Sequence, residues 1–144
     1  MKKIIFIFTI ILTVLLSSVA FAHCTLNRRQ WGFIGNDGNI EMYIDMPNVK
    51  VNGNLVETGL CYYFPTGCGM KHIGSKVEHY HMSLISINYN FNSYAVKSLV
   101  FGDINGNQTG GNYFDDGEVT YYPIPRDSLL EKFCLTALKI AGLY

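Results

Sequence analysis

The sequence lacks an excess of charge of either sign. Its 144 residues include 11 Lys and Arg against 11 Asp and Glu, and no run of basic residues is longer than two. Binding to nucleic acid or to anionic lipid depends on clustered positive charge. We therefore expect neither a nucleic-acid partner nor attachment to a membrane surface through charge.

Local catalytic motifs are also missing. The chain contains no Gly-x-Ser-x-Gly, no His-Glu-x-x-His and no glycine-rich phosphate loop. Glu78 and His79 are neighbours on an expected strand, so their side chains should point to opposite faces and not form a direct pair. The sequence favours a binding protein over an enzyme, although a site assembled across a sheet leaves no local motif.

Long hydrophobic runs are absent except at the N-terminus. There, Lys2 and Lys3 precede an apolar stretch from Ile4 to Leu16, and Ala20-Phe21-Ala22 follows. This pattern is typical of a bacterial signal peptide, and the stretch is shorter than the roughly 20 residues that span a bilayer. We predict that residues 1–22 are cleaved and that residues 23–144 form one secreted or periplasmic domain without a stable membrane anchor.

Four cysteines, Cys24, Cys61, Cys68 and Cys134, belong to the expected mature chain. An even number in a small exported domain predicts two disulfides, for which three connectivities exist. We favour Cys61–Cys68 as a local bridge and Cys24–Cys134 as a link from the N-terminus to the last helix. A zinc site is the alternative, but no Cys-x-x-Cys pair supports it.

Most of the chain follows the pattern of short strands. Asp37-Gly38 and Asn52-Gly53 each separate apolar runs, as in tight hairpins. A Gly/Asn-rich stretch over residues 102–112 predicts a loop. The expected strands are Trp31 to Ile34, Ile40 to Ile44, Val49 to Val51, Leu55 to Val56, Leu60 to Phe64, Val77 to Tyr89, Tyr94 to Phe101 and Glu118 to Tyr122.

The C-terminal segment changes to a helical period. Ser128 and Glu131 fit a capping box before an amphipathic helix from Leu129 to Ala141, and Gly142 is a typical helix stop. The predicted fold is therefore α+β: a small antiparallel, meander-like sheet with one C-terminal helix packed on it, stapled by disulfides.

Histidines suggest one candidate metal site. After cleavage, His23 would offer its α-amine and its imidazole, and His79 and His81 would share one strand face. These nitrogen donors suit copper. The terminal histidine alone resembles that of secreted copper proteins and copper-dependent polysaccharide oxygenases, which implies a copper-binding histidine brace. Two histidines on a strand are more often ordinary sheet residues, so we expect no cofactor, with copper as the alternative.

A calcium loop is a weaker candidate. Asp103 to Asn107 begins like an EF-hand loop, but Gln108 stands where glycine is needed and Phe114 where the bidentate glutamate is needed. A polar turn-forming loop explains this segment better than calcium does.

The sequence is rich in tyrosine, with ten residues. Tyrosine beside asparagine and glycine is typical of extracellular recognition surfaces, although strands also favour tyrosine. We expect a glycan or protein partner, as for a toxin's binding subunit, a colonisation factor involved in virulence, or a periplasmic inhibitor or immunity protein; a homo-oligomer is compatible with this. The alternative is a periplasmic copper protein. The candidate binding residues are Tyr62, Tyr63, Tyr89, Asn90, Asn92 and Tyr94.

Overall fold

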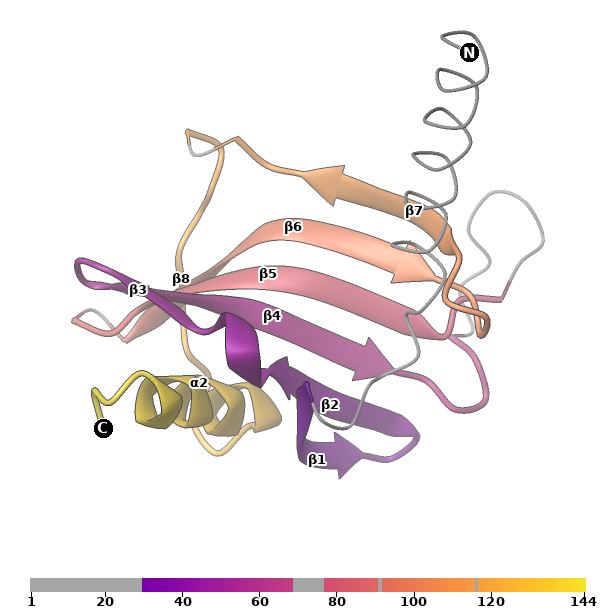
Figure 1. Ribbon diagram of the computed structural model, residues 1–144, viewed down its shortest axis with the longest axis horizontal. Helices are drawn as coiled ribbons and strands as arrows, with labels where there is room; N and C mark the ends of the chain where they lie inside the picture. Colours follow the sequence, from indigo (N-terminus) through magenta and orange to yellow (C-terminus); the bar gives the residue numbers. More distant parts are fainter. Residues whose placement is uncertain (1–29, 69–76, 91, 116) are drawn as a thin grey trace, which may run out of the picture.

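One curved antiparallel sheet organises the protein, and one helix packs on part of it (Figure 1). The structure is a computed structural model that describes residues 30–68, 77–90, 92–115 and 117–144. The predicted signal peptide, residues 1–22, lies outside the described residues. Within the described ranges, no helix is long and apolar enough to cross a membrane.

The sheet runs in the order β1-β2-β4-β5-β6-β7, with β3 paired to β4 and β8 paired to β6. Strands that are neighbours along this path therefore also follow one another in the sequence, if the short β3 and β8 are left aside. The strands are β1 (Trp31–Asp37), β2 (Ile40–Asp45), β3 (Lys50–Asn52), β4 (Leu55–Tyr63), β5 (Tyr80–Asn88), β6 (Ser93–Gly102), β7 (Gln108–Tyr113) and β8 (Tyr122–Pro123); a 3-10 turn, η1, covers Met46–Asn48, and the helix is α2 (Leu129–Ile140). The predicted α+β meander with a C-terminal helix is confirmed.

Two glycines make the tight hairpin turns that the sequence predicts. Gly38 between β1 and β2 has φ +57°, and Gly53 between β3 and β4 has φ +59°. A side chain is strained in this left-handed region, which explains glycine at both turns.

The segment over residues 102–112 differs from the prediction, because it contains β7 as well as a loop. A Cβ atom on Gly111 would lie 2.7 Å from the carbonyl oxygen of Leu99 on β6. Glycine at position 111 therefore allows the backbones of β6 and β7 to approach each other, although the composition of residues 102–112 is typical of a loop.

The hydrophobic core lies between α2 and one face of the sheet. Residues paired across antiparallel strands point to the same face, and Ile44, Leu60, Val56 and Ile87 follow this rule in two cross-strand pairs. The helix contributes Phe133, Cys134 and Ala137, and it contacts β1, β2 and β4. No helix covers the opposite face in the part of the chain that the structure describes.

Both ends of α2 form as the sequence predicts. The Ser128 hydroxyl accepts a hydrogen bond from the Glu131 backbone N–H at 3.0 Å, and the Glu131 carboxylate accepts one from the Asp127 N–H at 2.8 Å. Gly142 follows the helix with φ +73°, and its N–H donates to the Lys139 carbonyl. These bonds satisfy backbone groups that a helix terminus otherwise leaves unpaired.

The expected disulfide staples are not present among the described residues. Cys61, Cys68 and Cys134 are thiols, and Cys24 lies outside the described residues. The predicted Cys61–Cys68 bridge is wrong because Cys61 pairs with Met82 on one sheet face, whereas Cys68 lies near His81, which points to the other face.

The helix cap yields a stability prediction. We expect Ser128→Ala to lower the free energy of unfolding by about 1 kcal/mol, because the Glu131 N–H loses its acceptor. Urea denaturation measures the change. Thr136→Ala is the matched control: Thr136 lies on the same helix and donates only to the Lys132 carbonyl, so we expect a change within about 0.5 kcal/mol. Equal losses in both variants would contradict the role of the cap.

Candidate functional site

The base of the connection between β4 and β5 brings Cys68 beside Glu78. The Phe64 N–H donates to the His79 carbonyl at 2.8 Å, and the Cys68 N–H donates to the Glu78 carbonyl at 2.6 Å. Gly67, with φ +84°, allows the turn just before Cys68. These backbone bonds hold the two side chains at the end of the sheet.

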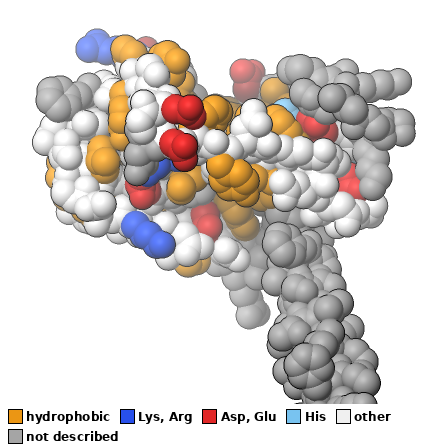
Figure 2. Space-filling view, turned by 90° about the horizontal axis from the view of Figure 1, so that it is seen from above, with side chains coloured by type: hydrophobic (Ala, Val, Ile, Leu, Met, Phe, Trp, Pro, Cys, Tyr) orange, Lys and Arg blue, Asp and Glu red, His pale blue; other side chains and the backbone are white. Residues whose placement is uncertain are grey.

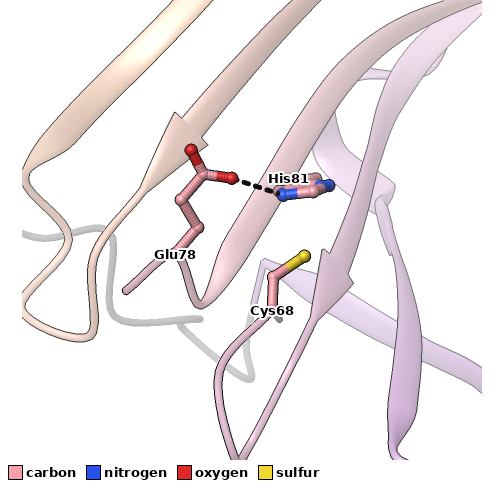
Figure 3. A group of neighbouring side chains, drawn as sticks. All are labelled: Cys68, Glu78 and His81. Atoms are coloured by element: carbon pink, nitrogen blue, oxygen red, sulfur yellow. Dashed lines mark hydrogen bonds and ion pairs between the residues drawn. The ribbon is translucent and has the colours of Figure 1, made fainter. Parts of the chain in front are cut away.

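Cys68, Glu78 and His81 form a cluster at this end (Figure 3). One ligand atom from each residue lies within 4.8 Å of the other two. The Oε2 atom of Glu78 lies 2.9 Å from Nε2 of His81, so the imidazole N–H donates to the carboxylate. The cluster thus combines a sulfur, an oxygen and a nitrogen donor.

The Glu78 side chain is fully buried and only partly satisfied. Its exposed fraction is 0 %, and its second oxygen, Oε1, has no hydrogen-bond partner among the described residues. Leaving a buried acceptor unpaired costs about 1–3 kcal/mol, and more for a charged group. Such groups are rare in native structures, so Glu78 is the unusual member of the cluster.

Two aromatic rings pack against His81. The ring centroids of Phe64 and Phe101 lie 4.8 Å and 4.7 Å from that of the imidazole. This packing restricts the rotation of the imidazole and reduces water around it. The result is a preorganised donor in a low-dielectric environment.

The predicted copper ligands are only partly brought together. His23 lies outside the described residues, and Nδ1 of His79 lies 2.8 Å from the carbonyl oxygen of Phe64, to which it donates. His81, by contrast, joins Cys68 and Glu78. The copper brace stays a prediction, and the structure presents a different donor set.

Sequence reasoning missed Cys68 and Glu78 for identifiable reasons. It assigned Cys68 to a disulfide and placed Glu78 inside a strand, where alternation would separate it from the histidines. The strand β5 begins at Tyr80, so Glu78 is not bound by this alternation and reaches His81 three residues later.

The uncovered face of the sheet carries a groove of about 300 Å³. A row of cross-strand neighbours crosses it: Trp31 pairs with Asp45, and Gly59 pairs with Leu84, which pairs with Ser98. Gly59 has no side chain to fill the groove, and its Cβ would lie 3.0 Å from the Cβ of Asp45 and 3.3 Å from the Trp31 ring. The other lining residues include Met82, Val100, Asn48, Lys50 and Glu57.

Charges in this groove balance one another. Glu57 forms an ion pair with Lys97 at 3.0 Å, and Asp45 accepts a hydrogen bond from the Asn48 amide at 2.8 Å. Figure 2 shows one face of the molecule, on which hydrophobic, acidic and basic side chains are mixed. The groove therefore offers an apolar floor with polar groups around it and no strong field of either sign.

A second hollow, of about 700 Å³, lies between the start of α2 and the β1–β2 hairpin. Tyr62 lines it together with Asp127, Ser128, Leu129 and Leu130. Ser128 and the Asp127 N–H already form the helix cap. Asn36, Asp37 and Lys132 are its other polar lining residues.

Several of the tyrosines predicted to bind a partner instead help to build the core. Tyr62, Tyr89 and Tyr94 pack against the hydrophobic core, and the Tyr89 hydroxyl donates to the Gly53 carbonyl at 3.2 Å. Burial, and then neighbouring Tyr94 and Cys134, raise the pKa of the Tyr62 hydroxyl above its ordinary value.

The other predicted binding residues are more dispersed. Asn90 and Asn92 are exposed at the turn between β5 and β6. The Tyr63 ring stacks on that of Tyr80, with 4.9 Å between the centroids. The turn around Asn90 and Asn92 stays a predicted contact surface, with asparagines as its exposed part.

The loop that begins like a calcium site is held by its own hydrogen bonds. Asp103 is 7 % exposed, and its carboxylate accepts bonds from the backbone N–H groups of Asn105 and Asn107, both at 2.9 Å. The Asn107 side-chain amide donates to the same carboxylate. Asp103 thus acts as the centre of a polar turn.

Comparisons with known proteins add no assignment. No protein-family model matches the chain, and no curated protein matches it.

The thiols should differ in reactivity, because the thiolate is the reactive form. Burial, and secondarily the Glu131 carboxylate, raises the pKa of the Cys134 thiol from 9.0 to about 12. At pH 8 this lowers its thiolate fraction about 1,000-fold. We expect iodoacetamide to modify the partly exposed Cys68 first and the buried Cys61 and Cys134 only after unfolding.

Peptide mass spectrometry of reduced protein, labelled in buffer and in urea, measures the labelling rates of Cys61, Cys68 and Cys134. The urea sample is the control, since all three thiols should react there at similar rates. Rapid labelling of Cys134 in the folded protein would contradict its position in the core.

Proposed function

We propose that this chain is an exported bacterial binding protein without catalytic activity, and that it recognises a glycan in the groove of its uncovered sheet face. The observation that supports the proposal most is the row of Trp31, Gly59 and Leu84, which leaves a hollow beside an indole ring on a rigid sheet. Sites on regular strands hold their contact groups more accurately than sites on loops.

The chemistry of the groove suits a sugar. The apolar C–H face of a sugar ring packs well on an indole, which gives a large contact area at low entropic cost. Asp45, Asn48 and Glu57 supply the acceptors and donors that hydroxyl groups need. The near balance of charge, with Lys50 and the Glu57–Lys97 ion pair, favours a neutral ligand over an ionic one.

The dimensions fit a short oligosaccharide. A groove of about 300 Å³ stands at the lower end of the range for small-molecule sites, and it is open along the sheet. One or two sugar rings can lie in it while the rest of a longer glycan extends into solvent. Recognition of a glycan would serve a toxin's binding subunit or a colonisation factor, two of the roles that the sequence suggests.

We prefer the groove as the glycan site to the turn that contains Tyr89 and Tyr94, because the rings of these two tyrosines also pack against the core. A ring that already packs against the core gains less contact area from a ligand. Trp31 is outside the core cluster and is only partly exposed on the sheet face.

The only tryptophan of the chain is the natural reporter for this proposal. A glycan array first identifies a bound oligosaccharide, and titration of the protein with it should change the Trp31 emission. We expect Trp31→Ala to weaken binding of that oligosaccharide at least about tenfold, which corresponds to about 1.4 kcal/mol. Calorimetry measures both affinities.

Tyr144→Ala is the matched control, because it removes an aromatic ring that is 73 % exposed at the chain end beyond α2. Its affinity should equal that of the unchanged protein. An array without any bound glycan, or equal affinities for the protein and its Trp31→Ala variant, would contradict the proposal. Binding to a protein partner through the turn that contains Asn90 and Asn92 would favour the alternative surface.

A further inference from the structure

Beyond the proposed glycan groove, we propose that Cys68, Glu78 and His81 bind one zinc ion at the end of the sheet. The site lies at the base of the connection between β4 and β5 and is separate from the groove: its residues do not line it. The inference does not depend on the proposed function.

The first support is the geometry of the donors. The three ligand atoms lie within 4.8 Å of one another, and the Glu78 and His81 atoms are 2.9 Å apart. Zinc binds sulfur at about 2.3 Å and nitrogen or oxygen at about 2.0–2.2 Å. Donors at this separation can therefore surround one ion with small movements of their side chains.

The second support is the buried carboxylate. Glu78 is 0 % exposed, and its Oε1 has no hydrogen-bond partner within the part of the chain that the structure describes. Figure 3 shows its carboxylate directed towards His81 beside Cys68. A cation would satisfy the carboxylate in a place that water does not reach. An uncharged partner would leave the negative charge of Glu78 uncompensated.

The donor types favour zinc over the hard, oxygen-preferring cations. A thiolate excludes magnesium and calcium, which prefer oxygen donors, whereas one sulfur, one nitrogen and one oxygen suit the borderline-soft Zn²⁺. On binding, the Cys68 thiol releases its proton to solvent and the thiolate sulfur bonds the ion. The neutral His81 imidazole takes the tautomer with its proton on Nδ1, which frees Nε2 to bind the ion in place of its hydrogen bond to Glu78. A tetrahedral ion then has one position left for water or a further donor.

The position of the ligands indicates what the ion does. Cys68 follows β4, whereas Glu78 lies just before β5 and His81 lies within it. Zinc would thus join the two sides of this connection and reinforce the hydrogen bond from the Cys68 N–H to the Glu78 carbonyl. It would provide the local link for which the sequence suggested a Cys61–Cys68 disulfide.

The test uses the exported chain, freed of any affinity tag, reduced, and then transferred to buffer without reductant or chelator. Elemental analysis after addition of Zn²⁺ and dialysis should give one zinc per chain. In competition with a chromophoric chelator, Cys68→Ser, Glu78→Gln and His81→Ala should each bind Zn²⁺ at least about 100-fold more weakly, since even outer-shell changes cost about 10–100-fold.

His79→Ala is the matched control. His79 lies two residues from His81, but its imidazole donates to the Phe64 carbonyl and is outside the cluster. The control should keep the affinity of the unchanged protein. Equal zinc affinity in the unchanged protein and its His81→Ala variant would overturn the proposal, and so would a loss confined to His79→Ala.

The spectrum of bound Co²⁺ tests the ligands in the unchanged protein, so this test does not depend on whether a variant folds. Co²⁺ bound to the unchanged protein should show a near-ultraviolet charge-transfer band from the Cys68 thiolate, together with the visible bands of a tetrahedral ion. Binding of Co²⁺ without the thiolate band would overturn the assignment of Cys68 as a ligand.

Discussion

The alternation of side chains along paired strands is the constraint on which this structure depends. Residues paired across the sheet point to one face, so the register places Ile44 and Leu60 under α2 and places Asp45 and Gly59 on the uncovered face. A shift of one residue in this register would expose the core and bury the groove. Packing against α2 makes such a shift unfavourable, because Phe133 would lose its contacts.

The same constraint separates the two candidate sites. The groove at Trp31 lies on the uncovered face, whereas His81 points to the face that α2 partly covers, at an end of the sheet enclosed by Phe64 and Phe101. Burial there makes a charged carboxylate costly and a cation favourable. Exposure on the other face keeps apolar and polar groups accessible to a ligand. One small sheet can thus support two chemically different sites.

Much of the fold could be predicted from local patterns. Asp37-Gly38 and the Ser128 cap each produced the element expected of them, because turns and helix ends are determined by adjacent residues. The cysteine pairing and the cluster could not be predicted, because they depend on which face each residue occupies. Glu78 illustrates the difficulty: its contact with His81 follows from where β5 begins, and this start is determined by pairing across the sheet.

We propose the uncovered face of the sheet as the recognition surface. Its most direct test is a two-dimensional ¹H–¹⁵N NMR titration of the labelled protein with an array-selected oligosaccharide. The indole signal of Trp31 and the amide signals of Gly59, Leu84 and Ser98 should shift together, while the amide signals of the exposed turn asparagines should stay unchanged. Shifts confined to Asn90 and Asn92, with the Trp31 indole signal unmoved, would contradict it.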